Sequence, residues 1–331
     1  MADHAAAVHD AVIDLLRQAV ERSPRPEKLL FQLSEALSAA GRDQESADVF
    51  RRAYLARPDS SLFVPGPNTD PRLLRERARA LIAHGAIFSP VIAALAVADV
   101  MLGEASEARR LVDYDRFCRW FTVEPPQRFA GIDFNAALAA EIKADLVFYG
   151  AADTTKHLAT RGAWRNDNVL TDRSAACLAL AQIVRESVHR YIEDLPHDAD
   201  HPFVASRPSS FVLEGWAIVS DRNSYLEPHL HPRAWLSAVY YVAQPAASRE
   251  ADSRCGWLQL GLPAEYGLDP SGGWDERLFE PQPGRLLLMP GYFLHGTSPM
   301  GSLAAGDERI SMAFDIVPAE IAAASPRTAR H

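Results

Sequence analysis

The 331-residue sequence contains little lysine and no excess of positive charge. Its 34 Lys and Arg residues include only three lysines, and 43 Asp and Glu residues outnumber them, which gives a formal net charge of -9. A protein that binds nucleic acid through a basic face needs the opposite balance. The acidic charge therefore predicts that nucleic acid is not a partner.

Long apolar runs and paired cysteines are also missing. No stretch reaches the ~18 uncharged apolar residues of a membrane-spanning helix, and the first residues lack a basic segment followed by a long apolar one. Cys118, Cys177 and Cys255 lie far apart, without the C-x-x-C spacing of a zinc knuckle. We therefore expect a cytoplasmic protein without a membrane partner, whose cysteines are small apolar core residues.

Several common catalytic patterns do not occur in the sequence. There is no phosphate-binding loop, no G-x-G-x-x-G motif, and no Ser/His/Asp or Cys/His arrangement. These absences argue against nucleotide chemistry and nucleophilic catalysis, and they direct attention to the histidines.

The residue pattern changes near residue 113. Up to Val112 the chain is rich in Ala and Leu at helical spacing, with almost none of the alternation of strands. One stretch, residues 30–58, has the spacing of a tetratricopeptide unit, a helix hairpin of about 34 residues, with its turn at residues 41–43. We predict an α+β protein with a helical, tetratricopeptide-like domain over 1–112 and a second domain over 113–331.

The second domain has mainly β texture. Helices are predicted over 135–143 and 174–194, the latter with one apolar stripe. Short apolar runs separated by Pro, Gly and Asp clusters then indicate a sandwich or jelly roll; these runs cover residues 211–219, 235–242, 256–260, 285–289 and 309–317.

The densest group of metal-ligating side chains is the segment Glu227-Pro-His229-Leu-His231-Pro232. In an extended chain, residues two apart point the same way, so His229 and His231 would present a pair of imidazole ligands. The flanking prolines restrict the backbone and favour this geometry. Because a lone His-x-His pair is more often part of a solvated loop, the assignment depends on the residues that follow.

Two later elements add candidates. His295 follows an apolar stretch that begins at Pro283, although such a lone histidine is usually a hydrogen-bonded core residue. Arg309 begins another apolar strand, with Ser311 on the same face. An arginine that points into a β domain needs an anionic partner, since burying it unpaired costs several kcal/mol. No acidic residue is obviously dedicated to this role.

In their order and spacing, these motifs resemble the iron(II)/2-oxoglutarate-dependent oxygenase superfamily. The most similar branch carries His-x-His-Pro followed by Ser-Gly-x-Tyr-Tyr, which here reads His229-Leu-His231-Pro232 and Ser237-Ala-Val-Tyr-Tyr241. The resemblance covers roughly residues 160–318. It implies that residues 113–331 form a double-stranded β-helix, a jelly roll with one Fe(II) at its mouth.

The resemblance also implies the metal ligands. His229 and His295 carry over as the two histidines of the family, and His231 stands where the family usually has a carboxylate. The site would then have three neutral ligands, as catalytic zinc has in carbonic anhydrase. Glu227 remains open as an alternative ligand, because it is the only acid within two residues of the pair.

The co-substrate residues follow from the same resemblance. Arg309 carries over as the partner of the distal carboxylate of 2-oxoglutarate, which a guanidinium binds through two parallel hydrogen bonds. Ser311 would donate a further hydrogen bond to it. Tyr241 matches a tyrosine that reaches this carboxylate in prolyl-hydroxylase-like members; the alternative is an ordinary strand aromatic. Tyr240 should then point the other way, into the packing.

The activity implied by the family is oxidative decarboxylation of 2-oxoglutarate to succinate and CO2, coupled to hydroxylation of a substrate. We predict a dioxygenase acting on a protein or peptide, with the helical repeats holding the target; alternatively, the helices only cap the β domain. Two other functions remain open, namely a cupin-like three-histidine metalloenzyme that does not use 2-oxoglutarate and a non-catalytic helical-repeat adaptor. The substrate and the outcome, whether hydroxylation, desaturation, demethylation or halogenation, are not encoded in these motifs.

Overall fold

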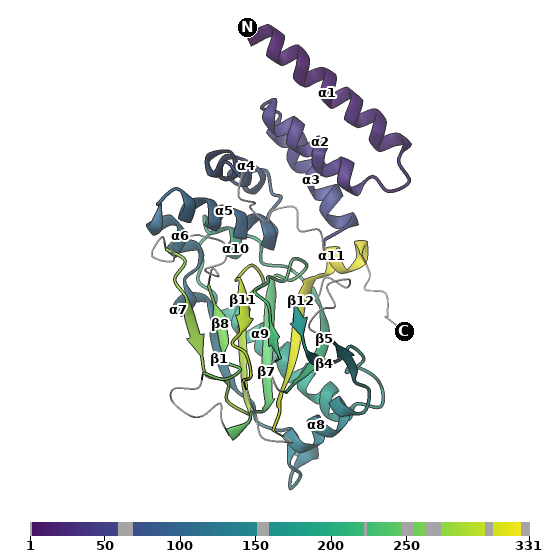
Figure 1. The fold of residues 1–331 in the computed structure, drawn as a ribbon, viewed down its shortest axis with the longest axis vertical. Coiled ribbons are helices and arrows are strands. Elements are labelled where there is room, and N and C mark those ends of the chain that lie inside the picture. The colour runs from purple at the N-terminus through teal and green to yellow at the C-terminus, as the bar shows by residue number, and fades with distance from the viewer. Residues whose placement is uncertain are drawn as a thin grey trace.

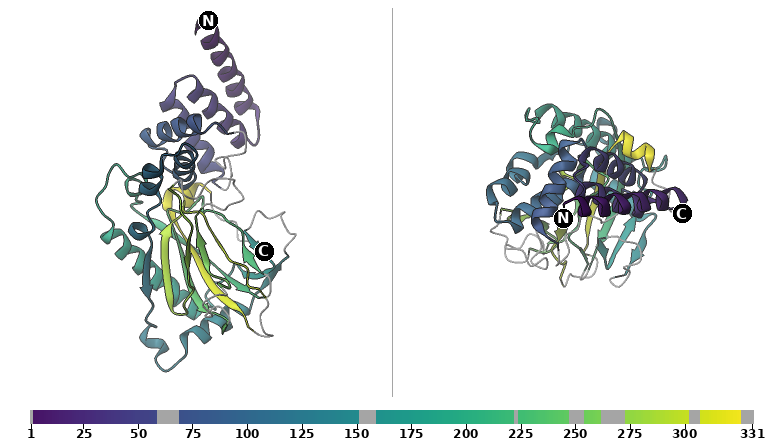
Figure 2. Two further views of the ribbon diagram at one scale, coloured as in Figure 1. Left: turned by 60° about the vertical axis from the view of Figure 1, so that its left-hand side comes forward. Right: turned by 90° about the horizontal axis from the view of Figure 1, so that it is seen from above.

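The computed structural model describes residues 2–58, 69–150, 159–221, 224–246, 254–261, 273–301 and 307–325. Its N-terminal part is helical, and α1 projects from one end of the molecule (Figures 1 and 2). None of the helices in the described part of the chain combines the length and the apolar character that crossing a membrane requires. The helices of the N-terminal part are α1 Ala2–Arg22, α2 Glu27–Ala39, α3 Asp43–Ala56, α4 Pro71–Ala83, α5 Ser89–Met101, α6 Ala105–Leu111 and α7 Tyr114–Phe117.

Helices α2 and α3 form the predicted hairpin. The turn between them contains Gly41 at φ +71°, a left-handed conformation that glycine adopts without strain. Phe31 of α2 and Phe50 of α3 pack edge to face, with ring centroids 5.4 Å apart. The hairpin is confirmed, whereas its identity as a tetratricopeptide repeat stays a prediction.

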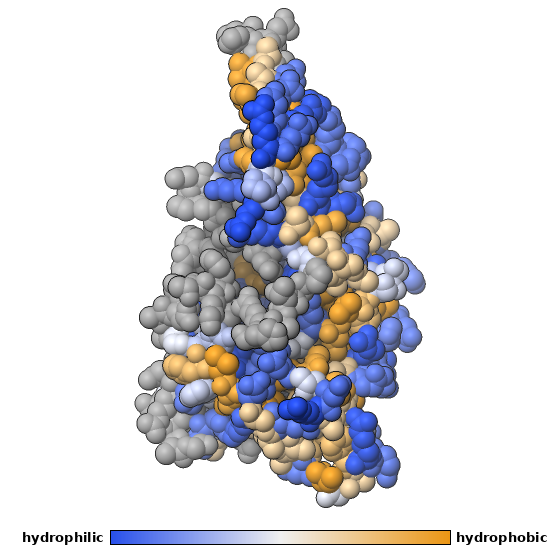
Figure 3. Space-filling model, turned by 90° about the vertical axis from the view of Figure 1, so that its right-hand side faces the viewer, coloured by the Kyte–Doolittle hydropathy of each residue, from blue (hydrophilic) through white to orange (hydrophobic). Residues whose placement is uncertain are grey.

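Helix α5 attaches the helical part to the rest of the protein. Its sequence is apolar on every side, and every residue from Ser89 to Val100 is buried, as expected of a helix enclosed by other elements. One continuous core runs from α2 through α5 into the β domain. On the face shown in Figure 3, hydrophilic residues cover much of the helical part, and apolar residues are interspersed lower down.

The β domain is built from two layers of antiparallel strands. The large sheet has seven strands in the order β1-β10-β7-β12-β5-β4-β2. The smaller strands form the sets β11-β8-β9 and β3-β6, which a bridge between His229 and His295 joins. The strands are β1 Arg119–Thr122, β2 Val147–Tyr149, β3 Thr160–Arg161, β4 Ala163–Asn166, β5 Phe211–Ser220, β6 Tyr225–Leu226, β7 Leu236–Ala243, β8 Leu258–Leu260, β9 Arg277–Phe279, β10 Arg285–Pro290, β11 His295–Thr297 and β12 Arg309–Pro318.

The chain crosses repeatedly between the two layers. From β5 to β12, the strands β5, β7, β10 and β12 belong to the large sheet, and β6, β8, β9 and β11 belong to the smaller sets. This pattern is a jelly roll. The long strands agree with the predicted apolar runs, and the fold predicted for this part is confirmed in its layers and its antiparallel pairing.

Two helices, α8 Phe134–Lys143 and α9 Ala175–Asp194, support the outer face of the large sheet. The buried side chains of α9 include Leu180, Val184 and Val188, which recur every four residues and form the stripe predicted from the sequence. Helix α9 lies behind the strands in Figure 1. The inner face of the sheet is thereby left to face the smaller strands, and the candidate site lies between these layers. The remaining elements are η1 Gln127–Phe129, α10 Pro202–Ala205 and α11 Ala319–Ala324.

Candidate functional site

Three histidines meet between the two layers. His229 follows β6, His295 begins β11, and the two residues exchange backbone hydrogen bonds of 2.9 Å in both directions. His231 lies two residues beyond His229, and one ring nitrogen from each of the three imidazoles falls within 4.8 Å of the others. The spacing of two residues and the pairing of two distant segments therefore bring together the three histidines that the sequence singles out.

Hydrogen bonds set the orientation of each imidazole. The Nδ1 atom of His229 lies 2.7 Å from the carbonyl oxygen of Glu227, and that of His295 lies 2.8 Å from the carbonyl oxygen of Phe293. The Nδ1 atom of His231 lies 2.5 Å from Asp315 Oδ1. Because carbonyl and carboxylate oxygens only accept hydrogen bonds, each Nδ1 is assigned the ring proton and each Nε2 keeps a free lone pair.

The free lone pairs are close enough to hold one cation between them. The Nε2 atoms of His231 and His295 are 3.1 Å apart, and their ring planes are inclined by only 2°. Burial, and to a smaller extent the neighbouring His231 imidazole, lowers the pKa of His229 to about 3. Burial also lowers the pKa of His295 well below its usual value. Two neutral imidazoles with facing lone pairs repel each other, and a bound metal ion removes that repulsion. The donor set thus fits a metal such as Fe(II) or Zn(II).

Glu227 does not belong to this cluster. Its carboxylate accepts hydrogen bonds of 3.0 and 2.6 Å from the guanidinium of Arg161, a buried residue of β3. This two-bond ion pair engages both carboxylate oxygens. Of the two alternatives that the sequence leaves open, the geometry groups His231, and not Glu227, with the other histidines.

Arg309 lies in the same region without an acidic partner. It is 2% exposed, its Nε has no hydrogen-bond partner within the described residues, and no carboxylate of that part of the chain forms an ion pair with it. Burial lowers the pKa of its guanidinium. Since an unpaired buried cation is costly, the site fits an anionic ligand that supplies the missing charge.

The two tyrosines of β7 point in opposite directions, as predicted. Tyr240 donates a 2.6 Å hydrogen bond to Asn135 Oδ1 on α8, on the outer side of the sheet. The guanidinium of Arg309 lies 5.6 Å from the centre of the Tyr241 ring, and burial raises the pKa of Tyr241 to about 12. The Tyr241 hydroxyl is buried beside the Arg309 guanidinium, whose charge opposes this rise in pKa.

A cavity of about 200 Å³ connects these groups. Its wall includes all three histidines together with Arg309 and Ser311, whereas Tyr241 lies behind Arg309 and does not line it. The sequence prediction of the site did not include three residues that lie at or beside this cavity. They are Asp315, which contacts His231, Trp216, which stacks on His231 at 5.8 Å between ring centres, and Arg165, which covers Trp216.

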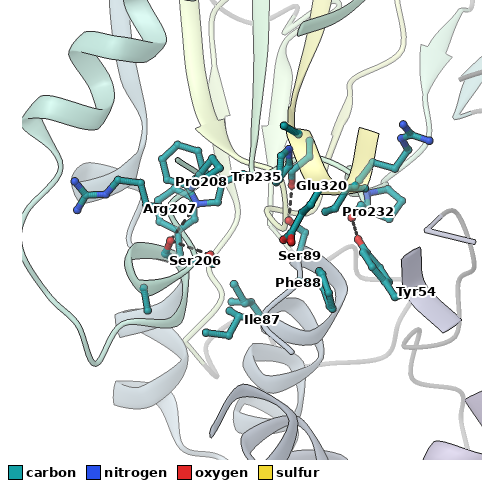
Figure 4. Close-up of a pocket in the computed structure, with 18 of the residues that line it drawn as sticks. Tyr54, Ile87, Phe88, Ser89, Ser206, Arg207, Pro208, Pro232, Trp235 and Glu320 are labelled. Carbon is teal, nitrogen blue, oxygen red and sulfur yellow. Dashed lines mark hydrogen bonds between the residues drawn. The ribbon is translucent and has the colours of Figure 1, made fainter. Parts of the chain in front are cut away.

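A second cavity of about 590 Å³ lies between the helical part and the end of the β domain (Figure 4). Tyr54 and Ser89 from the helices point toward the turn that follows His231. Ser89 Oγ donates a 2.6 Å hydrogen bond to the carbonyl oxygen of Ala234, and the Tyr54 hydroxyl donates one to that of Pro232. This cavity and the histidine cluster therefore border the same short segment of chain.

Comparison with known proteins agrees with this geometry. Residues 214–315, which contain all three histidines, Arg309 and Asp315, match the model of the family described as "Putative 2OG-Fe(II) oxygenase". The match covers less than half of the chain, and over these residues the chain is similar to that family. The family described is an oxygenase that uses Fe(II) and 2-oxoglutarate, and the histidine cluster suits the metal. The buried Arg309, which has no carboxylate partner in the described part of the chain, suits the co-substrate.

Several solved structures are similar at low identity. A Pseudomonas putida prolyl-4-hydroxylase is 17% identical, with a TM-score of 0.40 over 66% of this chain and 99% of that one. A Trichoplax adhaerens prolyl hydroxylase, in complex with a hypoxia-inducible-factor peptide fragment, is 12% identical, with a TM-score of 0.43 over 69% and 94%. HygX from Streptomyces hygroscopicus, with nickel and 2-oxoglutarate bound, is 15% identical, with a TM-score of 0.39 over 63% and 85%. No curated protein matches the sequence. These similarities are too low to identify a substrate.

Proposed function

We propose that His229, His231 and His295 hold Fe(II) through their Nε2 atoms, and that Arg309 binds the distal carboxylate of 2-oxoglutarate. The observation that carries this proposal is the presence, in one cavity, of three neighbouring imidazole nitrogens and a buried arginine that pairs with no carboxylate among the described residues. Ser311 lies two residues from Arg309 on the same strand and is buried in the same wall. Its hydroxyl is a further donor for the co-substrate, whereas Tyr241, which is outside the cavity wall, contacts the Arg309 guanidinium that binds it.

The residues of the chain then bind the metal and the co-substrate, orient them, and exclude water from the site. Bound Fe(II) supplies oxygen activation, with overall conversion of 2-oxoglutarate, O2 and a substrate C–H group to succinate, CO2 and the hydroxylated product. With His229, His231 and His295 as its protein ligands, Fe(II) would keep positions for the 2-oxo acid and O2. The apolar residues of the wall, including Val239, Leu258 and Met289, keep the site dry.

We further propose that the substrate is a protein or peptide side chain. The cavity of about 200 Å³ is smaller than the roughly 300–1,000 Å³ typical of sites that enclose a small molecule. It has room for the co-substrate and one projecting side chain. The larger cavity beside the helices then supports a role for the helical hairpins in holding the rest of the target, as tetratricopeptide-like platforms do.

An anaerobic titration tests the metal and co-substrate assignment. Fe(II) followed by 2-oxoglutarate is added to metal-free protein, and we expect the visible charge-transfer band of a 2-oxo acid chelated to ferrous iron. His295→Ala should abolish the band, and Arg309→Ala should shift its appearance to much higher 2-oxoglutarate concentration. His189→Ala, at an exposed position of α9, is the matched control and should leave the band unchanged.

The same titration distinguishes the proposed oxygenase from the alternative three-histidine enzyme that does not use 2-oxoglutarate. If iron binds but the band never forms, and Arg309→Ala does not affect turnover, the cupin-like function replaces the oxygenase proposal. The substrate class has its own test, in which succinate release is measured with peptide mixtures and with small metabolites. A small metabolite that stimulates release when no peptide does so contradicts the peptide proposal and leaves the metal assignment intact.

A further inference from the structure

The described residues place one carboxylate in contact with the histidine cluster, and it is not a ligand. Asp315 belongs to β12, where it lies opposite Glu214 of β5 and Ser237 of β7. The residue is 8% exposed, and its Oδ1 is 2.5 Å from His231 Nδ1. A carboxylate in this position can act on the metal only through the imidazole.

His231 differs from the other two histidines in how its ring is held. Backbone carbonyl groups accept the Nδ1 protons of His229 and His295, and these acceptors are part of the main chain. For His231 the acceptor is a side chain from a strand 84 residues away. The orientation of this one ligand therefore depends on the identity of a distant residue.

The side-chain acceptor also fixes which nitrogen is free. A neutral imidazole carries one proton, and a carboxylate at Nδ1 keeps the proton there, so the lone pair remains on Nε2. Such an outer carboxylate also raises the basicity of the ligand nitrogen. Trp216 stacks on one face of the ring at an interplanar angle of 17°, which restricts its rotation.

We propose that Asp315 is a positioning residue that holds the His231 imidazole with Nε2 directed at the metal. The carboxylate that this family usually places on the iron is then one hydrogen bond removed from it, and His231 connects the two. This inference rests on the proposed metal site and adds a residue to it. It predicts that a change at Asp315 affects the metal through His231 alone.

The test uses the full-length protein in two states. In metal-free protein, ¹⁵N-edited NMR of the histidine rings should show the His231 proton on Nδ1, and Asp315→Leu should abolish that signature. In a Co(II) titration, Asp315→Asn and Asp315→Leu should weaken binding by about 10- to 100-fold, the loss typical of outer-shell partners. The cobalt d–d spectrum should change in the same way as in His231→Ala.

Glu214→Gln is the matched control. Glu214 lies directly across from Asp315 on the neighbouring strand, is similarly buried, and pairs with Arg233 at 2.9 Å instead of with an imidazole. Its substitution removes a comparable carboxylate and should leave Co(II) affinity and spectrum unchanged. If both substitutions weaken binding equally, Asp315 has only a general structural role and the inference is wrong.

A double variant isolates the pathway through His231. Once His231→Ala has removed the ligand, adding Asp315→Asn should reduce Co(II) affinity no further, because the two residues act as one unit. Additive losses would overturn the inference. Wild-type protein that binds no Co(II) would overturn the proposed function as well, whereas wild-type binding that Asp315→Asn leaves unchanged would overturn this inference alone.

Discussion

Replacement of Arg309 by methionine should have opposite effects on stability and on ligand binding. The side chain is buried, its Nε has no hydrogen-bond partner in the described structure, and its compensating contact is the ring of Tyr241 at 5.6 Å. Burying an ion costs several kcal/mol, and a desolvated cation–π contact returns about 2 kcal/mol of it. We therefore expect Arg309→Met to stabilise the ligand-free protein by about 1–4 kcal/mol.

The same substitution should remove the stabilisation that 2-oxoglutarate confers. At a concentration 100-fold above its Kd, a ligand adds about 2.7 kcal/mol to the free energy of unfolding. Loss of the buried charge pair should cost the co-substrate about 2–5 kcal/mol of affinity, or about 30-fold to several thousand-fold. Urea unfolding of the Co(II)-loaded protein under nitrogen, with and without 2-oxoglutarate, measures both effects.

Arg233→Met provides the contrast for this experiment. Arg233 is also a buried arginine, but it is paired with Glu214, so its loss should destabilise the protein by about 3–5 kcal/mol. Arg233→Met should leave unchanged the gain in unfolding free energy that 2-oxoglutarate confers. The reasoning is refuted if Arg309→Met destabilises the ligand-free protein as Arg233→Met does, or if it retains the full increment from the co-substrate.

Three further predictions concern stability away from the site. Burial lowers the pKa of His201 to about 4, and its Nε2 donates a hydrogen bond to the carbonyl oxygen of Arg110. Between pH 6.5 and 4 the unfolded chain therefore binds a proton that the folded protein does not. The free energy of unfolding should fall as the pH falls through this range. His201→Leu should reduce the pH slope of the unfolding free energy by up to about 1.4 kcal/mol per pH unit, and an unchanged slope in urea titrations would contradict this. Phe50→Ala should cost about 3–5 kcal/mol, because its fully buried ring packs against Phe31, Tyr54 and Phe88. Because one core joins helices and sheet, unfolding should stay a single transition, and a separate early transition of the helices would show that reasoning to be wrong.

Short-range patterns predicted much of the site. The alternation of a strand places His229 with His231 and Arg309 with Ser311, and neither placement needs information from elsewhere in the chain. The same alternation continues along β12 to Asp315, which lies on the face of Arg309 and Ser311. That period was a signal from which an inward-facing carboxylate was predictable.

Long-range pairing explains what the pattern did not predict. The contact of Asp315 with His231 spans 84 residues, and the pairing of Arg161 with Glu227 spans 66. No local period specifies either one, because each depends on which strands become neighbours. Strands β2, β3, β4, β6, β9 and β11 were also not predicted, since strands of two to four residues show little or no alternation.

The hydrogen bonds from Tyr54 and Ser89 to the turn after His231 have a consequence for protein engineering. If the β domain were separated from the helices, the carbonyl oxygens of Pro232 and Ala234 would lose these donors, and the apolar surface that α5 covers would face water. A chimaera that exchanges the helical part should therefore keep α5 and the C-terminal end of α3. The segment available for exchange is then α1, α2 and the outer surface of the hairpin.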